Sequence, residues 1–112
     1  MAQADAATQF MEAMDRRDWE AAFEVFTVDC HWHSPGTRID TVGRDAAKRQ
    51  FAAFVEQTGA RYRLVDVHEH QNLTTIFFDG EATHDGQRVE FPGVVVIRWE
   101  GGKVAELWGM RG

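Results

Sequence analysis

Two pairs of histidines have the spacing of ligands on one face of a β-strand. His31 and His33 are separated by one residue, and so are His68 and His70. Residues i and i+2 of a strand point to the same side, roughly 6.5–7 Å apart, and imidazole nitrogens bind zinc and related metals. No cysteine or carboxylate follows either pair at ligand spacing. We therefore expect solvated strand histidines, and neither a metal nor an organic cofactor.

His33 and Ser34 form the first candidate for catalysis. They end a predicted strand at residues 28–34 and precede Pro35-Gly36, which is a strong turn signal. An imidazole suits a general base near neutral pH. Neighbouring strand residues point to opposite faces, so we expect only one of these two side chains to enter a pocket. The alternative is a histidine bonded to nearby backbone at the turn.

Asp66 and His68 form the second candidate. They share one face of a predicted strand and could make a carboxylate–imidazole pair. Leu64 lies two residues before Asp66 and is expected on the same face of the strand, so its apolar side chain favours partial burial of that face. The alternative is a solvated outer face.

The elements that position these residues follow from apolar spacing. Helical periodicity predicts a first helix containing residues 7–14 and a second, N-capped by Asp18, that includes Trp19 and extends to Phe26. A third helix is predicted over residues 44–57, with Gly59 at its C-terminal cap. Strands are predicted at residues 28–34, 37–42, 61–71, 73–84, 88–99 and 103–110.

Turn residues punctuate the second half of the chain. Asp85-Gly86 predicts a tight hairpin between the fourth and fifth strands. Gly80 and Pro92 interrupt strand patterns, so we expect a bulge or bend at each. Helices followed by a run of strands indicate an α+β fold.

Composition limits the partners. The 112 residues suit one domain over residues 1–112, and a net charge of −6 disfavours nucleic acid. No apolar run approaches the ~20 residues that span a bilayer, so we expect no membrane association. The N-terminus lacks a signal-peptide pattern, and Cys30 is the only cysteine. These features favour the cytoplasm.

Four segments, in this order, resemble the SnoaL-like, nuclear transport factor 2-like and ketosteroid-isomerase-like superfamily: MEAMDRRDWEAAFEVF, VDCHWHSPG, VGRDAAKRQFAAF and RWEGGKVAELWGM. The resemblance covers residues 10–110. It implies a cone-shaped barrel, in which one strongly curved, mainly antiparallel sheet carries about three helices on its concave side and encloses a pocket. It places the early hairpin beside the C-terminal strand and residues 61–71 at the opposite edge, which would separate the two histidine pairs.

The resemblance also implies a homodimer through the outer face of the sheet. Trp99, Trp108 and the run 94–97 could supply its apolar surface, although burial within the monomer would explain them equally well.

The known catalytic positions of this superfamily carry other residue types here. By resemblance, the isomerase base corresponds to Ser34, its oxyanion-binding tyrosine to Phe10 and its protonated acid to Val95. The acid/base aspartate of the polyketide cyclases corresponds to Gly109. None of these four residues can do the corresponding proton chemistry, so the known mechanisms are not expected.

Two hypotheses of function stay open at this point. The first is an acid–base lyase, isomerase or cyclase acting on a small hydrophobic or cyclic substrate, with His33 as base and Asp66–His68 as a secondary pair. The second is non-catalytic binding of a hydrophobic ligand, or an association module. Both predict a small hydrophobic or aromatic partner, held by apolar residues at Phe10, Met14, Trp32, Phe51, Phe54, Phe78, Phe91, Val95 and Leu107.

Overall fold

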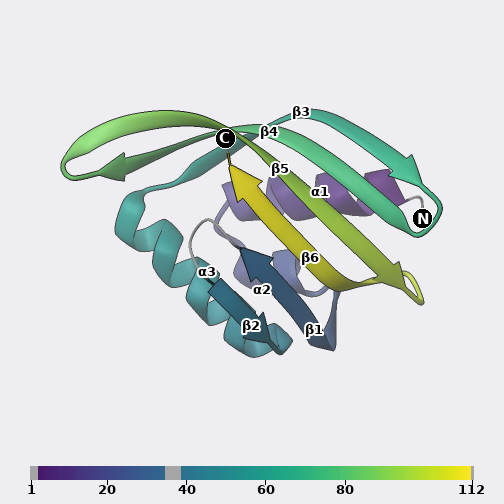
Figure 1. Cartoon of the computed structure of the whole chain (residues 1–112). Coiled ribbons are helices and arrows are strands. Elements are labelled where there is room, and N and C mark those ends of the chain that lie inside the picture. Colours follow the sequence, from purple (N-terminus) through teal and green to yellow (C-terminus); the bar gives the residue numbers. More distant parts are fainter. Residues whose placement is uncertain (1–2, 35–38, 112) are drawn as a thin grey trace.

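The computed structural model describes residues 3–34 and 39–111, which form one curved sheet with helices on its concave side (Figure 1). The predicted Pro35-Gly36 turn and the start of the second strand lie outside the described residues. The helices are α1 (Gln3–Asp15), α2 (Trp19–Phe23) and α3 (Arg44–Thr58). The strands are β1 (Phe26–Ser34), β2 (Ile39–Val42), β3 (Arg61–His70), β4 (Leu73–His84), β5 (Gln87–Glu100) and β6 (Lys103–Arg111).

The sheet has the strand order β2-β1-β6-β5-β4-β3. All neighbouring strands are antiparallel except β1 and β6, which are parallel. The early hairpin therefore lies beside the C-terminal strand and β3 lies at the opposite edge, as expected. The fold class is the predicted one: α+β, with a strongly curved sheet around a pocket.

The predicted helix caps are present, but α2 is shorter than its apolar spacing suggested. The Asp18 carboxylate accepts a hydrogen bond from the Ala21 amide at 3.2 Å, and Gly59 ends α3 with φ of 63°. Phe26, predicted on α2, instead begins β1, where it pairs with Val104. The hydrogen bond from the Val104 amide to the Val25 carbonyl, 2.7 Å long, fixes the chain here in the sheet.

The hairpin at Asp85-Gly86 is confirmed. Both residues have positive φ, 50° and 79°, as a type I′ turn requires. Of the bulge or bend expected at Gly80 and at Pro92, the bulge is absent, because both residues pair in continuous register between β4 and β5. The bend stays a prediction. The Phe91 ring fills the space above Gly80, and Pro92 lies just beyond the part of β5 that pairs with β6.

Register shifts occur instead at three other places: between Leu64 and Asp66 in β3, between Arg98 and Trp99 in β5, and between Phe26 and His31 in β1. The first of these decides which way the side chains of β3 point, because one extra residue reverses the alternation of faces.

Aromatic side chains fill the core between the sheet and the helices. The Phe23 ring stacks on Phe26 and on Trp32, with ring centroids 4.8 and 5.8 Å apart. Of the residues considered for an outer apolar surface, Ile97 and Trp99 are buried in this core, whereas Trp108 and its cross-strand neighbour Val96 are partly exposed. No helix among the described residues combines the length and the apolar character needed to cross a membrane.

Candidate functional site

A cavity of about 110 Å³ lies inside the cone, against the concave face of the sheet. All nine residues predicted to hold a ligand line it. The lining within the described chain consists of Phe10, Met11, Met14, Trp32, Ser34, Phe51, Phe54, Tyr62, Phe78, Phe91, Val95, Leu107, Gly109 and Met110. Their role in ligand binding stays a prediction.

Regular periodicity brings these residues together. Phe10 and Met14 are four residues apart on α1, and Phe51 and Phe54 are three apart on α3, so each pair shares one helix face. Strand alternation turns Trp32 and Ser34 of β1 inward, and Leu107 with Gly109 of β6 likewise.

Tyr62 lines the cavity but was not among the residues predicted to do so. Its ring stacks against Phe51 at 5.9 Å and meets Phe78 edge-on at 5.3 Å between centroids. The sequence pattern that could have placed Tyr62 is its spacing from Leu64: residues two apart on a strand point to the same face, and Leu64 packs on the core.

The polar groups of the described lining are few. Ser34 and Tyr62 carry hydroxyls and Trp32 carries an indole N–H, but no carboxylate, imidazole, ammonium or guanidinium group lines the cavity within residues 3–34 and 39–111. The four positions that correspond to catalytic groups in the superfamily, Phe10, Ser34, Val95 and Gly109, all contribute to the lining. The cavity thus coincides with the expected site and lacks its ionisable groups.

The placement of His33 contradicts its suggested role as a base for a ligand in the cavity. Since Trp32 and Ser34 turn inward, alternation sends His33 to the outer face of the sheet. Its imidazole donates a hydrogen bond to the Glu106 carboxylate at 2.9 Å and stacks on the Trp108 indole, with centroids 5.3 Å apart. Of the pair His33 and Ser34, only Ser34 enters the cavity, as expected for neighbours on one strand.

Asp66 and His68 do form the suggested carboxylate–imidazole pair, with 2.9 Å between Asp66 Oδ2 and His68 Nε2. Their side chains are however 60% and 63% exposed, and neither lines the cavity. The expectation of a partly buried face was wrong because the register shift after Leu64 reverses the parity. Leu64 and Val67 pack on the core, and Asp66 and His68 face outward.

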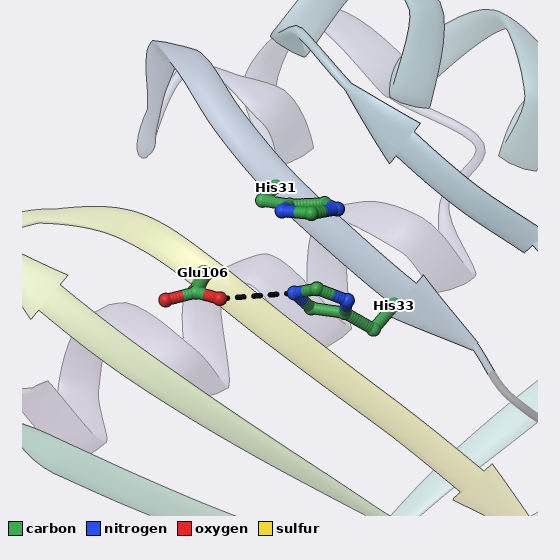
Figure 2. A group of neighbouring side chains, drawn as sticks. All are labelled: His31, His33 and Glu106. Atoms are coloured by element: carbon green, nitrogen blue, oxygen red, sulfur yellow. Dashed lines mark hydrogen bonds and ion pairs between the residues drawn. The ribbon is translucent and has the colours of Figure 1, made fainter.

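A second cluster of polar residues lies on the outer face, across β1, β2 and β6. His31 bonds to Asp40. His33 bonds to Glu106, as Figure 2 shows. The hydrogen bond from His33, supported by one from Arg98, holds the pKa of the Glu106 carboxyl below its ordinary value, although partial burial opposes this shift. The hydrogen bond from His31 likewise lowers the pKa of Asp40. No sequence pattern pointed to Glu106 as a member of this cluster, because its partner His33 is 73 residues away.

Comparison with known proteins agrees with this architecture. Among curated proteins, none matches the chain significantly. A protein of cystatin-like fold from Xanthomonas campestris superposes with a TM-score of 0.90 at 19% identity, covering 100% of this chain and 92% of that one. Bal32a, from a soil-derived mobile gene cassette, gives 0.89 at 22% identity, with coverage of 96% and 87%.

TerC, co-crystallised with polyporic acid, gives a TM-score of 0.84 at 18% identity and covers 95% of this chain and 88% of its own. At these identities the likeness concerns the fold alone. The family model of the SnoaL-like domain, by contrast, matches the sequence over residues 7–107, which is nearly the whole chain. The chain therefore belongs to the SnoaL-like domain family.

Proposed function

We propose that this protein binds a small, ring-shaped apolar molecule reversibly in its central cavity and releases it unchanged. The observation that carries the proposal is the lining itself: its described residues include no carboxylate, imidazole, ammonium or guanidinium group, and the phenol of Tyr62 is the only titratable side chain among them. General acid–base catalysis most often uses a histidine or a carboxylate within hydrogen-bond reach of the ligand. The two groups suggested for that task, His33 and the Asp66–His68 pair, lie on the outer face.

The size of the cavity limits the ligand to about one ring. A volume of about 110 Å³ is below the range of roughly 300–1,000 Å³ typical of pockets for larger molecules. An apolar cavity of about 150 Å³ in another protein is known to bind benzene. A benzene-sized or slightly smaller ligand is therefore the best match, and a polycyclic one would require the walls to move.

The walls favour an aromatic ligand with one polar substituent. Trp32, Phe51, Tyr62 and Phe78 surround the space with ring faces and edges, which suit offset-stacked or edge-on contacts with another ring. Ser34 and Tyr62 supply hydroxyls that both donate and accept hydrogen bonds. Small phenols combine these properties. TerC, a neighbour in fold, has been co-crystallised with polyporic acid, and ligand binding by this fold is in keeping with the proposal.

The proposal can be tested by titrating the protein with phenol, p-cresol, toluene and cyclohexanol while following amide shifts by NMR. Val95→Phe fills the cavity and should abolish binding. Val89→Phe is the matched control, because Val89 lies on the same strand but is 42% exposed. It should leave the affinity unchanged.

Two results would contradict reversible binding in this cavity. One is that Val95→Phe, shown to be folded by its amide spectrum, binds the ligand as the wild type does. The other is that mass spectrometry of the incubated ligand finds a new product that Val95→Phe does not form. The second result would restore the enzymatic hypothesis with groups other than His33.

We also propose that two copies associate through the outer face of the sheet. Val96 and Trp108 are neighbours across β5 and β6 and both are partly exposed, and Phe77 on β4 is 43% exposed. Burial of such apolar area stabilises association. Val96→Glu should lower the sedimentation coefficient to that of a monomer, whereas Val28→Glu, at a site 71% exposed on β1, should not. A wild-type protein that sediments as a monomer would contradict the proposal.

A further inference from the structure

We propose that His31, His33 and Glu106 form a binding site for a divalent transition-metal ion, with Zn²⁺ as the best match. The site lies on the outer face of the sheet, so it is separate from the central cavity, and its argument does not rest on the function proposed for that cavity. One ligand atom from each residue lies within 4.8 Å of the others, and all three side chains are partly buried. Figure 2 shows the two imidazoles and the carboxylate gathered at the β1–β6 junction.

Strand pairing brings the three side chains together. His31 and His33 share one face of β1, and His31 pairs directly with Glu106 across the parallel β1–β6 ladder. The two imidazole rings converge until their centroids are 3.7 Å apart. This is well below the roughly 6.5–7 Å that separates residues i and i+2 along a strand. No carboxylate follows the two histidines at ligand spacing along the sequence, and the neighbouring strand supplies one instead.

The geometry is close to that of a coordination shell. Tetrahedral zinc with bonds of about 2.0–2.2 Å to nitrogen and oxygen holds its ligand atoms roughly 3.3–3.6 Å apart. His33 Nε2 and Glu106 Oε2 are 2.9 Å apart, joined by a hydrogen bond. A metal ion that displaced the proton shared in this hydrogen bond would bind the same nitrogen and oxygen. Small rotations of the imidazoles would then let His31 bind the ion as well.

Outer partners hold the carboxylate in place, as is usual for metal ligands. Arg98 Nε donates to Glu106 Oε1 at 3.0 Å and leaves the other oxygen directed at His33. Asp40 bonds to His31 and has an oxygen 3.7 Å from His33 Nδ1. Asp40 is thus placed to orient the histidines.

The local charge suits a divalent cation. Asp40, Glu100 and Glu106 contribute three negative charges, and Arg98, which contacts Glu100 at 3.4 Å, contributes one positive charge. The histidines are neutral when they bind metal, so the cluster carries a net charge of about −2. Two imidazoles with carboxylate oxygens favour zinc, copper or nickel over magnesium and calcium, which prefer sites made entirely of oxygen.

The test is isothermal titration calorimetry of the full chain, free of any histidine tag and treated with EDTA, with ZnCl₂ as titrant. We expect saturable binding of one ion per chain and no binding of MgCl₂. His33→Gln and Glu106→Gln preserve side-chain size and hydrogen bonding but remove a good ligand, so each should weaken binding by about tenfold or more. His68→Gln is the matched control, because His68 also pairs with a carboxylate but lies on β3 at the opposite edge.

Specific outcomes would overturn the site. The absence of saturable Zn²⁺ binding by the wild-type protein would contradict the proposed site directly. Equal affinity in wild type and Glu106→Gln, or an equal loss in His68→Gln, would show that zinc binds elsewhere. Far-UV circular dichroism verifies that each variant is folded. Trp108 gives a second readout: Cu²⁺ at the site should quench its fluorescence, and the quenching should be reduced in Trp108→Phe and in His33→Gln.

Discussion

The Phe78 ring on β4 lies directly over Gly93 on β5 and occupies the space where a side chain at position 93 would stand. The two residues are cross-strand partners, and a Cβ added at Gly93 would lie 2.6 Å from Phe78 Cε2. Because Phe78 also lines the cavity, this contact sets how far its ring extends into the ligand space.

Gly93→Ala should therefore affect both stability and ligand binding. We expect the free energy of unfolding to fall by about 1–3 kcal/mol, as is typical of overpacked cores. The displaced ring should narrow the cavity and weaken ligand binding. Urea denaturation and the NMR titration measure these two effects.

The double variant Gly93→Ala/Phe78→Leu supplies the control, because the smaller side chain leaves room for the new methyl group. The two substitutions should be coupled, with part of the lost stability recovered. If the changes in free energy of unfolding of the two single variants simply added in the double variant, the Phe78 ring would not be what restricts side-chain size at position 93.

Leu107→Ala should destabilise the fold by about 2–5 kcal/mol, because truncating a buried leucine removes apolar burial and leaves a void. Leu107 is only 1% exposed and lines the cavity. Leu73→Ala is the comparison, since Leu73 is also a strand residue but is 36% exposed. Thermal and urea unfolding of both variants should differ clearly. The enlarged cavity of Leu107→Ala should also accept p-cresol or a larger phenol in preference to phenol.

Cys30 should be chemically inert in the folded protein. Its side chain is buried, and desolvation raises the pKa of the thiol above the ordinary value of 9.0. Ellman's reagent should react rapidly with the chain in urea and only slowly with the native chain at pH 8. Rapid reaction of the native protein would mean that β1 opens far more readily than its packing indicates.

The same pKa shift makes stability fall in alkaline solution. The folded state favours the protonated thiol, so this contribution is fully present below about pH 9 and is lost as the pH rises through the folded pKa. The difference in free energy of unfolding between wild type and Cys30→Ala should shrink above pH 9. A difference independent of pH up to 11 would contradict the shift.

Gly109→Asp would place a carboxylate at the position that corresponds to the acid/base aspartate of the cyclases. There is space for it, since an added Cβ would be 3.8 Å from Leu107 Cδ2 and 4.0 Å from Ser34 Oγ. The apolar surroundings should raise the pKa of the new carboxyl above its usual value of about 3.9. This variant should therefore lose stability relative to Gly109→Asn as the pH rises from 4 to 7. Carbon-detected NMR titration gives the pKa directly, and a value at or below 4 would mean that water reaches the site freely.

The apolar part of the site could be predicted from sequence because it depends on local periodicity. The spacing of Phe10 and Met14, or of Phe51 and Phe54, fixes a helix face whatever the rest of the chain does. Strand parity likewise put Trp32 and Ser34 on one side of β1 and His33 on the other, although parity alone did not say which side faces the cavity.

The polar part depends on register, which no local pattern reveals. A single shift between Leu64 and Asp66 turned the Asp66–His68 pair to solvent. The pairing of His31 with Glu106 requires the parallel alignment of two strands far apart in sequence. The outer cluster could therefore be recognised only once the strands were in place.

β1 forms a wall between the two sites, with Trp32 and Ser34 facing the cavity and His31 and His33 facing the outer cluster. A ligand in the cavity and an ion on the outside would both contact this four-residue segment, with no intervening layer of side chains. Any twist of β1 that one of them favours is imposed on the other. By thermodynamic reciprocity, the factor by which the ion alters ligand affinity equals the factor by which the ligand alters ion affinity. Two titrations of the same chain, each with the other partner saturating, would measure that linkage.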